Sequence, residues 1–238
     1  MKKLKLFYSL ALFAGFIVSA NGADSAVKAY WNFGSASSLS DAPQITAVAP
    51  PVSVGALGAV RSGNATVISS SSVSGSYSGA SGGGNAGIGF GPANPSFSLT
   101  AAPYFSWTVT PSTPGTGLTI TPASVSFGSR STGTGARKWD LYAVSENGAV
   151  ETHLGGGNIN PNSSWTLHSI NVAAGTLSDA ELSAGAPVEF RLYGWDFTAA
   201  NGGTVTWRID DLTLEFACGS CHAPRLRQSF HRRRCHER

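Results

Sequence analysis

The C-terminal segment holds the residues whose spacing is most typical of a chemical site. In its string CGSCH, Cys218, Cys221 and His222 follow the C-x-x-C-H pattern that attaches a c-type haem. Two thioether bonds and a histidine ligand to the iron would be the chemistry of this pattern. Too few residues follow His222 to build a pocket that shields a haem from water. A haem-bearing protein is therefore kept as an alternative, and no cofactor is expected.

The same segment has two other interpretations. Cys218, Cys221 and Cys235, with His231 or His236, would supply the three sulfurs and one nitrogen of a structural zinc site. Cysteines of exported proteins tend to form disulfides instead, which counts against zinc. The abrupt change to Arg, His and Cys where the last predicted strand ends fits a disordered basic tail, or a frame-shifted sorting signal, and we favour this interpretation.

Two adjacent aspartates, Asp210 and Asp211, are ligands of the type that calcium prefers. In the surrounding stretch TVTWRIDDLTLEF, apolar residues occupy odd positions before the pair and even positions after it. One face of a strand cannot serve both sets without an extra residue, so we predict a β-bulge at the pair. The carboxylates of such a bulge can equally accept hydrogen bonds from the backbone or from arginine. We favour this second role, because no further calcium ligands are identifiable.

One pair of aromatic residues could bind sugar. In PVEFRLYGW, Tyr193 and Trp195 have the opposite parity from the apolar residues, and an exposed ridge of the two rings could stack on a polysaccharide. The alternative is a strand end that a loop covers. His153 and His168 lie in no recognisable catalytic motif, so we assign no catalytic residue and expect no enzyme. An uncharacterised secreted hydrolase is kept as an alternative.

The elements that must position these residues are predicted to be β-strands. Glycine, serine and threonine are abundant, helix-period patterns are absent, and short apolar alternations are separated by turn residues. The glycine-rich stretch 78–95 is predicted to be a mobile loop. The pattern indicates an all-β fold, an antiparallel β-sandwich spanning residues 23–216, with residues 217–238 as the tail. The expected strands are 27–33, 52–60, 64–77, 104–111, 117–131, 138–145, 164–172, 187–195 and 204–216.

Residues 1–22 are typical of a secretory signal peptide, because lysines precede a short apolar run that small residues close. We expect export to the periplasm, the cell surface or the medium. No other apolar run is long enough to cross a bilayer, so no membrane span is expected in the mature chain. The net charge is +3, but basic residues gather in the leader and the tail. The body between them is acidic, and nucleic acid is not an expected partner.

Three strings, SFGSRSTGTG, FRLYGW and WRIDDLTL, resemble a β-sandwich domain common in exported bacterial proteins, many of which end in a PEP-CTERM sorting signal. The similarity runs from AYWNF to LTLEF, nearly the whole body. It implies a jelly-roll sandwich like that of carbohydrate-binding modules, and a surface or extracellular-matrix protein that binds polysaccharide or cell-envelope components. It brings no catalytic residues. The Pro-Glu-Pro motif and apolar stretch of the sorting signal do not follow Phe216.

Overall fold

A computed structural model describes residues 25–31, 33, 44–46, 52–60, 77–81, 84–89, 96–111, 118–145, 149–173, 177, 187–198 and 205–220. Every regular element among them is a β-strand, so the all-β prediction is confirmed. No helix in this part of the chain is long and apolar enough to span a membrane. The strands are β1 (Ser25–Trp31), β2 (Gln44–Thr46), β3 (Val52–Val54), β4 (Gly58–Val60), β5 (Ala86–Gly89), β6 (Tyr104–Pro111), β7 (Leu118–Ser131), β8 (Lys138–Ser145), β9 (Val150–Asn158), β10 (Trp165–Asn171), β11 (Val188–Trp195) and β12 (Val205–Ser220).

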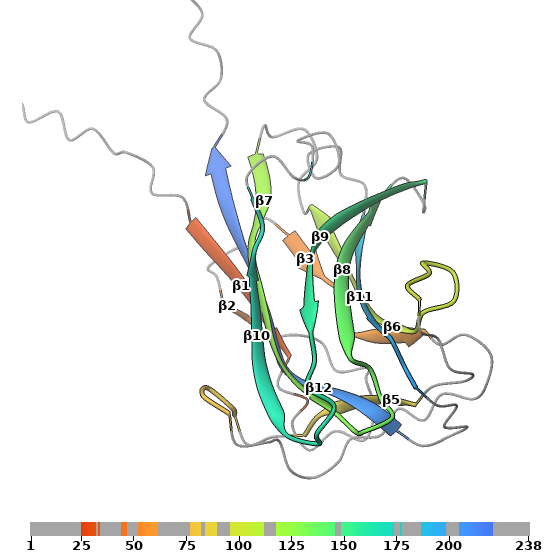
Figure 1. The fold of residues 1–238 in the computed structure, drawn as a ribbon. Coiled ribbons are helices and arrows are strands. Elements are labelled where there is room, and N and C mark those ends of the chain that lie inside the picture. The colour runs from red at the N-terminus through yellow and green to blue at the C-terminus, as the bar shows by residue number, and fades with distance from the viewer. Residues whose placement is uncertain are drawn as a thin grey trace, which may run out of the picture.

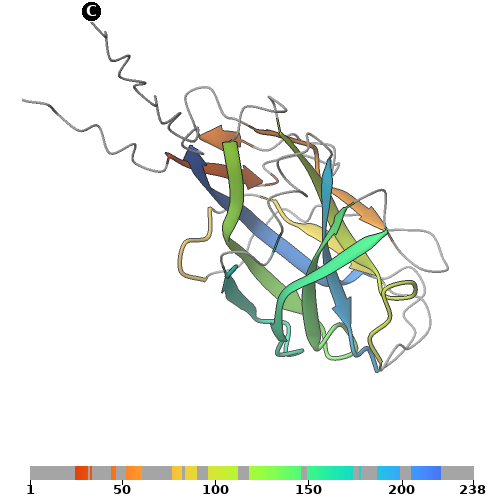
Figure 2. The same ribbon diagram turned by 90° about the horizontal axis from the view of Figure 1, so that it is seen from above.

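The strands form two antiparallel sheets that pack face to face (Figures 1 and 2). Sheet A has the order β10-β7-β12-β1-β2, and β5 also pairs with β12. Sheet B has the order β3-β6-β11-β8-β9, and β4 also pairs with β6. The predicted antiparallel β-sandwich is therefore confirmed.

Eight of the strands show the nested pairing of a jelly roll. In chain order β1, β6, β7 and β8 lead into β9, β10, β11 and β12. The first of the eight pairs with the last (β1 with β12), the second with the seventh (β6 with β11), the third with the sixth (β7 with β10), and the fourth with the fifth (β8 with β9). A long antiparallel hairpin rolled into two sheets gives this order, which confirms the expected jelly roll.

The core lies between the sheets and is rich in aromatic rings. Three ring pairs each take one member from each sheet, and all six side chains are buried. The pairs are Trp31 with Trp107 at 5.7 Å between centroids, Phe105 with Trp207 at 5.1 Å, and Phe127 with Trp139 at 5.1 Å. Large aromatic side chains bury the most apolar surface per residue, so these contacts do much to hold the two sheets together.

The predicted β-bulge in β12 is confirmed. The register with β7 shifts between Asp210 and Thr213, so that Asp211 and Leu212 stand opposite a single residue, Phe127. Asp211 has a φ of 49°, in the left-handed region that aspartate tolerates better than most residues. The extra residue lets the apolar side chains on both sides of the bulge point into the same core, and Trp207, Ile209, Leu212, Leu214 and Phe216 are all buried.

The structure corrects the sequence-based strand boundaries in several places. The stretch 78–95 is not all loop, because its residues Ala86–Gly89 form β5, which is buried and pairs with β12. Strands β9 and β2 have no counterpart among the expected strands, and the expected strand 52–60 is two short strands, β3 and β4. Strand β12 continues to Ser220, four residues beyond the predicted end of the domain at Phe216, because it pairs with β1 as far as Cys218 and with β7 as far as Ser220. The predicted strand 64–77 lies, apart from Tyr77, outside the described residues, as do residues 1–22 and 221–238.

Candidate binding face on sheet B

Four strands of sheet B place rows of side chains on their outer face, and all of these except the buried Val144 are polar or aromatic. In β11, the alternation that buries Val188, Phe190 and Leu192 turns Glu189 and Arg191 outward. The strand register then aligns two rows, each with one residue from β6, β11, β8 and β9 in that order. The rows are Ser106–Arg191–Tyr142–His153 and Thr108–Glu189–Val144–Glu151. We call the outer side of these four strands the sheet B face.

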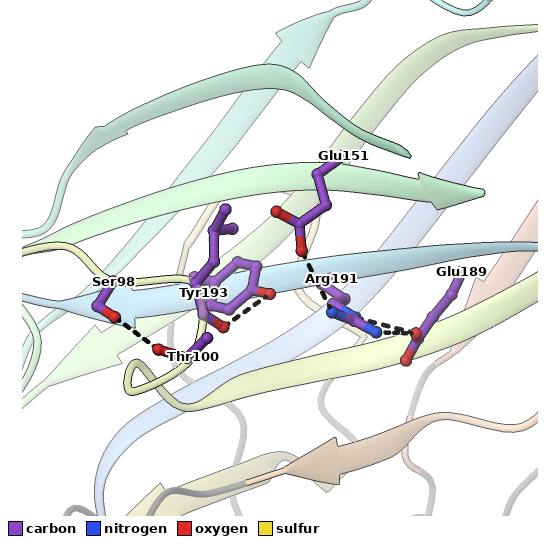
Figure 3. A network of polar contacts seen from close by, with 7 residues as sticks. Ser98, Thr100, Glu151, Glu189, Arg191 and Tyr193 are labelled. Carbon is purple, nitrogen blue, oxygen red and sulfur yellow. Dashed lines mark hydrogen bonds and ion pairs between the residues drawn. The ribbon is translucent and has the colours of Figure 1, made fainter. Parts of the chain in front are cut away.

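Arg191 is the centre of a polar network on this face (Figure 3). Its Nε and Nη2 donate to Oε2 of Glu189 at 2.9 and 2.6 Å, and its Nη1 lies 3.9 Å from Oε1 of Glu151. The guanidinium also lies 5.0 Å from the ring centroid of Tyr104, within the range of a cation–π contact. Burial works to lower the pKa of Arg191, but the hydrogen bonds to Glu189 outweigh it and raise the pKa above its usual value. The network therefore holds a permanent cation beside two carboxylates.

Tyr193 does not form the exposed ridge that the sequence suggested. Its side chain is 0% exposed, its hydroxyl donates to the carbonyl oxygen of Leu99 at 3.4 Å, and the ring of Phe97 meets it edge-on at 5.5 Å. The turn after Phe97 is closed by a contact of 3.1 Å between the hydroxyls of Ser98 and Thr100 (Figure 3). The alternation in β11 correctly predicts that Tyr193 points away from the core. A loop covers this end of β11, as the alternative interpretation has it.

Trp195 lies at the same end of β11 and is half-buried. Its indole N–H donates to Oδ2 of Asp140 at 2.6 Å, and Nζ of Lys138 lies 4.5 Å from its ring centroid. The other oxygen of Asp140 contacts Nε2 of His153 at 2.9 Å. Asp140 thus fixes both the indole and the imidazole, so the Trp195 ring is held in one orientation at the surface.

Tyr142 continues the aromatic surface toward β9. Its ring stacks on Phe97 at 5.5 Å between centroids and contacts the ring of His153 at 4.9 Å. Burial raises the pKa of both Tyr142 and Tyr104, so both hydroxyls stay protonated and can donate. Sugar rings pack their C–H faces on such aromatic surfaces, and carboxylates, hydroxyls and guanidinium groups bond to sugar hydroxyls. The sheet B face offers both kinds of group.

The sequence pattern contains a signal for two of these residues. The alternation in KWDLYAVS and PVEFRLYGW places Tyr142 and Arg191 on the solvent side of their strands. Only the pairing of the strands shows that they are neighbours. His153 and Glu151 cannot be placed from the sequence, because β9 is not among the expected strands.

The two aspartates of the β12 bulge lie on the outer side of sheet A, away from this face. Asp211 accepts hydrogen bonds from the hydroxyls of Tyr30 and Tyr77 and, at 2.8 Å, from the backbone N–H of Ser81. Oδ1 of Asp210 accepts from the N–H of Asp211 at 2.9 Å. The carboxylates therefore take hydrogen bonds, the role that the sequence favoured, with tyrosine hydroxyls in place of arginine. Among the described residues no three His, Cys, Asp or Glu side chains could hold a metal together, and calcium at this pair stays a prediction.

The remaining sequence-predicted groups are dispersed. Cys218 lies in β12 opposite Ser25 and Ile120, whereas Cys221 and His222 lie outside the described residues, so haem and zinc at this segment stay predictions. His168 points between the sheets, 5.3 Å from the ring centroid of Phe127 and 5.7 Å from that of Trp139. Burial lowers its pKa, which indicates a neutral structural histidine.

No family model matches the chain, and no curated protein matches it either. Among solved structures, the carbohydrate-binding module CBM4 is similar at 15% identity and a TM-score of 0.39, over 69% of this chain and 87% of that one. A family 11 carbohydrate-binding module from Clostridium thermocellum, in complex with a β-1,3-1,4-mixed-linked tetrasaccharide, is similar at 14% identity and a TM-score of 0.36, over 79% and 95%. A family 29 module complexed with mannohexaose is similar at 13% identity and a TM-score of 0.34, over 80% and 92%. These similarities are low, and the fold of this chain rests on its own strand order.

Proposed function

We propose that this chain is an exported, non-catalytic surface or extracellular-matrix protein that binds a neutral polysaccharide on the sheet B face. The observation that carries the proposal is the row Ser106–Arg191–Tyr142–His153, flanked by the partly exposed rings of Tyr104 and Trp195. Neighbouring strands lie about 4.8 Å apart, so the row crosses roughly 14 Å of the sheet. A sugar chain lying across the strands would meet an aromatic ring and hydrogen-bonding groups along this path.

The charges of the sheet B face favour a neutral ligand. The face carries three carboxylates, of Asp140, Glu151 and Glu189, and two cations, Lys138 and Arg191. Both cations already contact other side chains of the face. An acidic polymer would meet these carboxylates and be repelled, whereas a neutral sugar chain can accept from Arg191 and donate to the glutamates. Both glutamates are engaged by Arg191, an arrangement that suits binding, and we assign neither of them a catalytic role.

The proposal is tested by electrophoresis of the full chain in gels that contain a panel of neutral polysaccharides, followed by calorimetry with any that retard it. We expect Tyr142→Ala to weaken binding at least about tenfold, which corresponds to roughly 1.4 kcal/mol, because it removes the central ring of the row. His153→Ala, at an exposed position, is a second variant that spares the packing of Phe97. Trp165→Ala removes an aromatic ring from the other sheet and is the matched control.

Two results would contradict the proposal. One is a wild-type protein that no polysaccharide of the panel retards. The other is retention of full affinity by Tyr142→Ala and His153→Ala when their thermal unfolding shows that both are folded.

A further inference from the structure

The outer side of sheet A carries a row of a different character. Trp165 of β10 stands opposite Arg130 of β7, and Arg130 stands opposite Arg208 of β12. All three point away from the core, because their neighbours Ser129 and Ile209 are buried between the sheets. Like charges directly opposite on adjacent strands destabilise a sheet, so a pair of facing arginines calls for an explanation.

Each arginine donates a hydrogen bond to a neutral acceptor. Nε of Arg130 donates to the carbonyl oxygen of Ser163 at 2.7 Å, and Nη1 of Arg208 donates to Oδ1 of Asn85 at 2.8 Å. Neither of these two acceptor groups carries a negative charge. Burial and, after it, the charge of Arg130 lower the pKa of Arg208, as expected for two cations held side by side. An anion between them would relieve this repulsion.

An aromatic surface adjoins the arginine pair. The half-buried ring of Trp165 lies 6.0 Å from that of Tyr77, at an interplanar angle of 32°. Tyr77 is fixed in turn, because its hydroxyl bonds to Asp211 and its ring lies over Gly128. Leu167, on the same side of β10 as Trp165, is 47% exposed. Rigid rings beside two guanidinium groups can recognise a flat, partly apolar ligand that carries an anionic group.

We propose that Trp165, Arg130 and Arg208 form a second binding site, for an acidic polysaccharide. The carboxylate or sulfate group of a sugar accepts hydrogen bonds from the two guanidinium groups, and the sugar ring packs against Trp165. The carboxylates that follow in β12, Asp210 and Asp211, are buried and already accept hydrogen bonds at the bulge. The site is independent of the neutral-sugar site on the sheet B face, and the two proposals are tested separately.

The test uses the full chain in gels containing polygalacturonate, dextran sulfate or plain dextran, with calorimetry on a galacturonate trisaccharide. We expect retardation by an acidic polymer and not by plain dextran, and weaker binding as salt is added. Arg130→Gln and Arg208→Gln should each weaken binding about tenfold, the loss of one charge-assisted contact. Trp165→Ala should weaken it too, while Tyr142→Ala should leave it unchanged. Retardation by only one of the acidic polymers identifies the anionic group.

The control is Arg137→Gln, which removes one positive charge at an exposed position outside the row. Equal losses in Arg137→Gln and Arg130→Gln would show that net charge alone drives binding, and would overturn the proposal. So would full affinity in folded Arg130→Gln and Arg208→Gln, which would place binding in the basic C-terminal segment, or a wild-type chain that no acidic polymer retards. Arg208→Lys keeps the positive charge, and it replaces Arg208→Gln as the test variant if Arg208→Gln does not fold.

Discussion

Asp211 combines a left-handed backbone conformation with three hydrogen bonds to its carboxylate. Burial works to raise its pKa, but the bonds from Tyr30, Tyr77 and Ser81 outweigh it and lower the pKa below its ordinary value. Tyr30 is one of the donors to Asp211, and burial together with this contact raises the pKa of Tyr30 to about 12. Asp211 is therefore a buried anion whose charge contributes to the stability of sheet A.

We predict that Asp211→Asn lowers the free energy of unfolding at pH 7 by about 2 kcal/mol, because hydrogen bonds to a charged acceptor are lost. A carboxyl with a depressed folded pKa stabilises the fold above its unfolded pKa, near 3.9, and this contribution is lost as the pH falls through the folded value. The difference between variant and wild type should therefore shrink below about pH 4. Urea unfolding at several pH values measures it.

Asp196→Asn is the matched control, because Asp196 also has a positive φ, of 64°, and is not fully buried. A loss as large as that of Asp211→Asn would mean that the hydrogen bonds to the Asp211 carboxylate do not account for the effect.

His168 gives a second pH dependence at the scale of one residue. Its ring lies between Phe127 and Trp139, and in the described part of the chain its Nε2 has no hydrogen-bond partner. Burial lowers its pKa, so the unfolded chain binds the proton near pH 6.5 and the folded chain only at lower pH. Protonation favours the unfolded state, and this stabilising contribution is lost as the pH falls below about 6.5.

We predict that His168→Phe removes part of the decline in stability between about pH 6.5 and 5, because phenylalanine fills the same aromatic contacts without titrating. The measurement is the urea midpoint across this range. His153→Gln removes the more exposed histidine and should keep the decline. An unchanged slope in His168→Phe would show that His168 does not titrate in this way.

At the scale of an element, Gly128 lets β7 accept a ring on its outer side. A Cβ at this position would lie 2.3 Å from Cζ of Tyr77, so the ring occupies the place of the missing side chain. We predict that Gly128→Ala displaces Tyr77 and destabilises the protein by about 1–3 kcal/mol, the usual range for overpacking. Thermal unfolding measures the loss.

Gly133→Ala is the control, because only one atom, at 3.9 Å, lies near the added methyl group. Loss of the contact between Tyr77 and Asp211 should also remove the benefit of the Asp211 charge. Gly128→Ala and Asp211→Asn should then be less than additive in the double variant. If the two losses of stability are fully additive, the Tyr77 ring over Gly128 and the Asp211 charge stabilise the protein independently.

The strands that can be predicted from sequence are those whose apolar residues alternate within one segment. KWDLYAVS and YFSWTVTP predict β8 and β6 with their bounds, and the change of parity around Asp210 predicts the bulge. Strand β9, VETHLGGGN, lacks that alternation because three of its residues are glycines. Two of these glycines let side chains of β8 lie close to the backbone of β9. A Cβ on Gly157 would lie 2.9 Å from Nε1 of Trp139, and one on Gly156 would lie 2.1 Å from Oδ1 of Asp140.

The surface of the sheets is harder to predict than the core. Parity places Tyr193 outward, but it cannot show that Phe97 and Leu99, distant in sequence, cover the ring. The facing pair Arg130 and Arg208 also depends on strand register, which no local pattern in the sequence contains. Candidate sites built from several strands are therefore found only once the pairing is known.

At the scale of the whole molecule, β12 is the strand of sheet A that pairs with β1, β5 and β7. Beyond Phe216, it pairs with β1 as far as Cys218, which stands opposite both Ser25 and Ile120, and with β7 as far as Ser220. We predict that a chain ending at Phe216 is less stable than one ending at Ser220 by about 2–4 kcal/mol, at roughly 1 kcal/mol for each lost backbone hydrogen bond. Equal melting temperatures for the two chains would contradict the pairing beyond Phe216.

The nested pairing puts the first and last strands of the roll side by side, with Ser25 directly across from Cys218 (Figure 2). Whatever is joined before β1 or after β12 must therefore leave from the same end of the sandwich. A tether at either end would present the module in the same orientation. Because that end belongs to neither outer face, the two proposed sites lie on opposite sides of a module tethered there, and two polymers bound to them would be cross-linked.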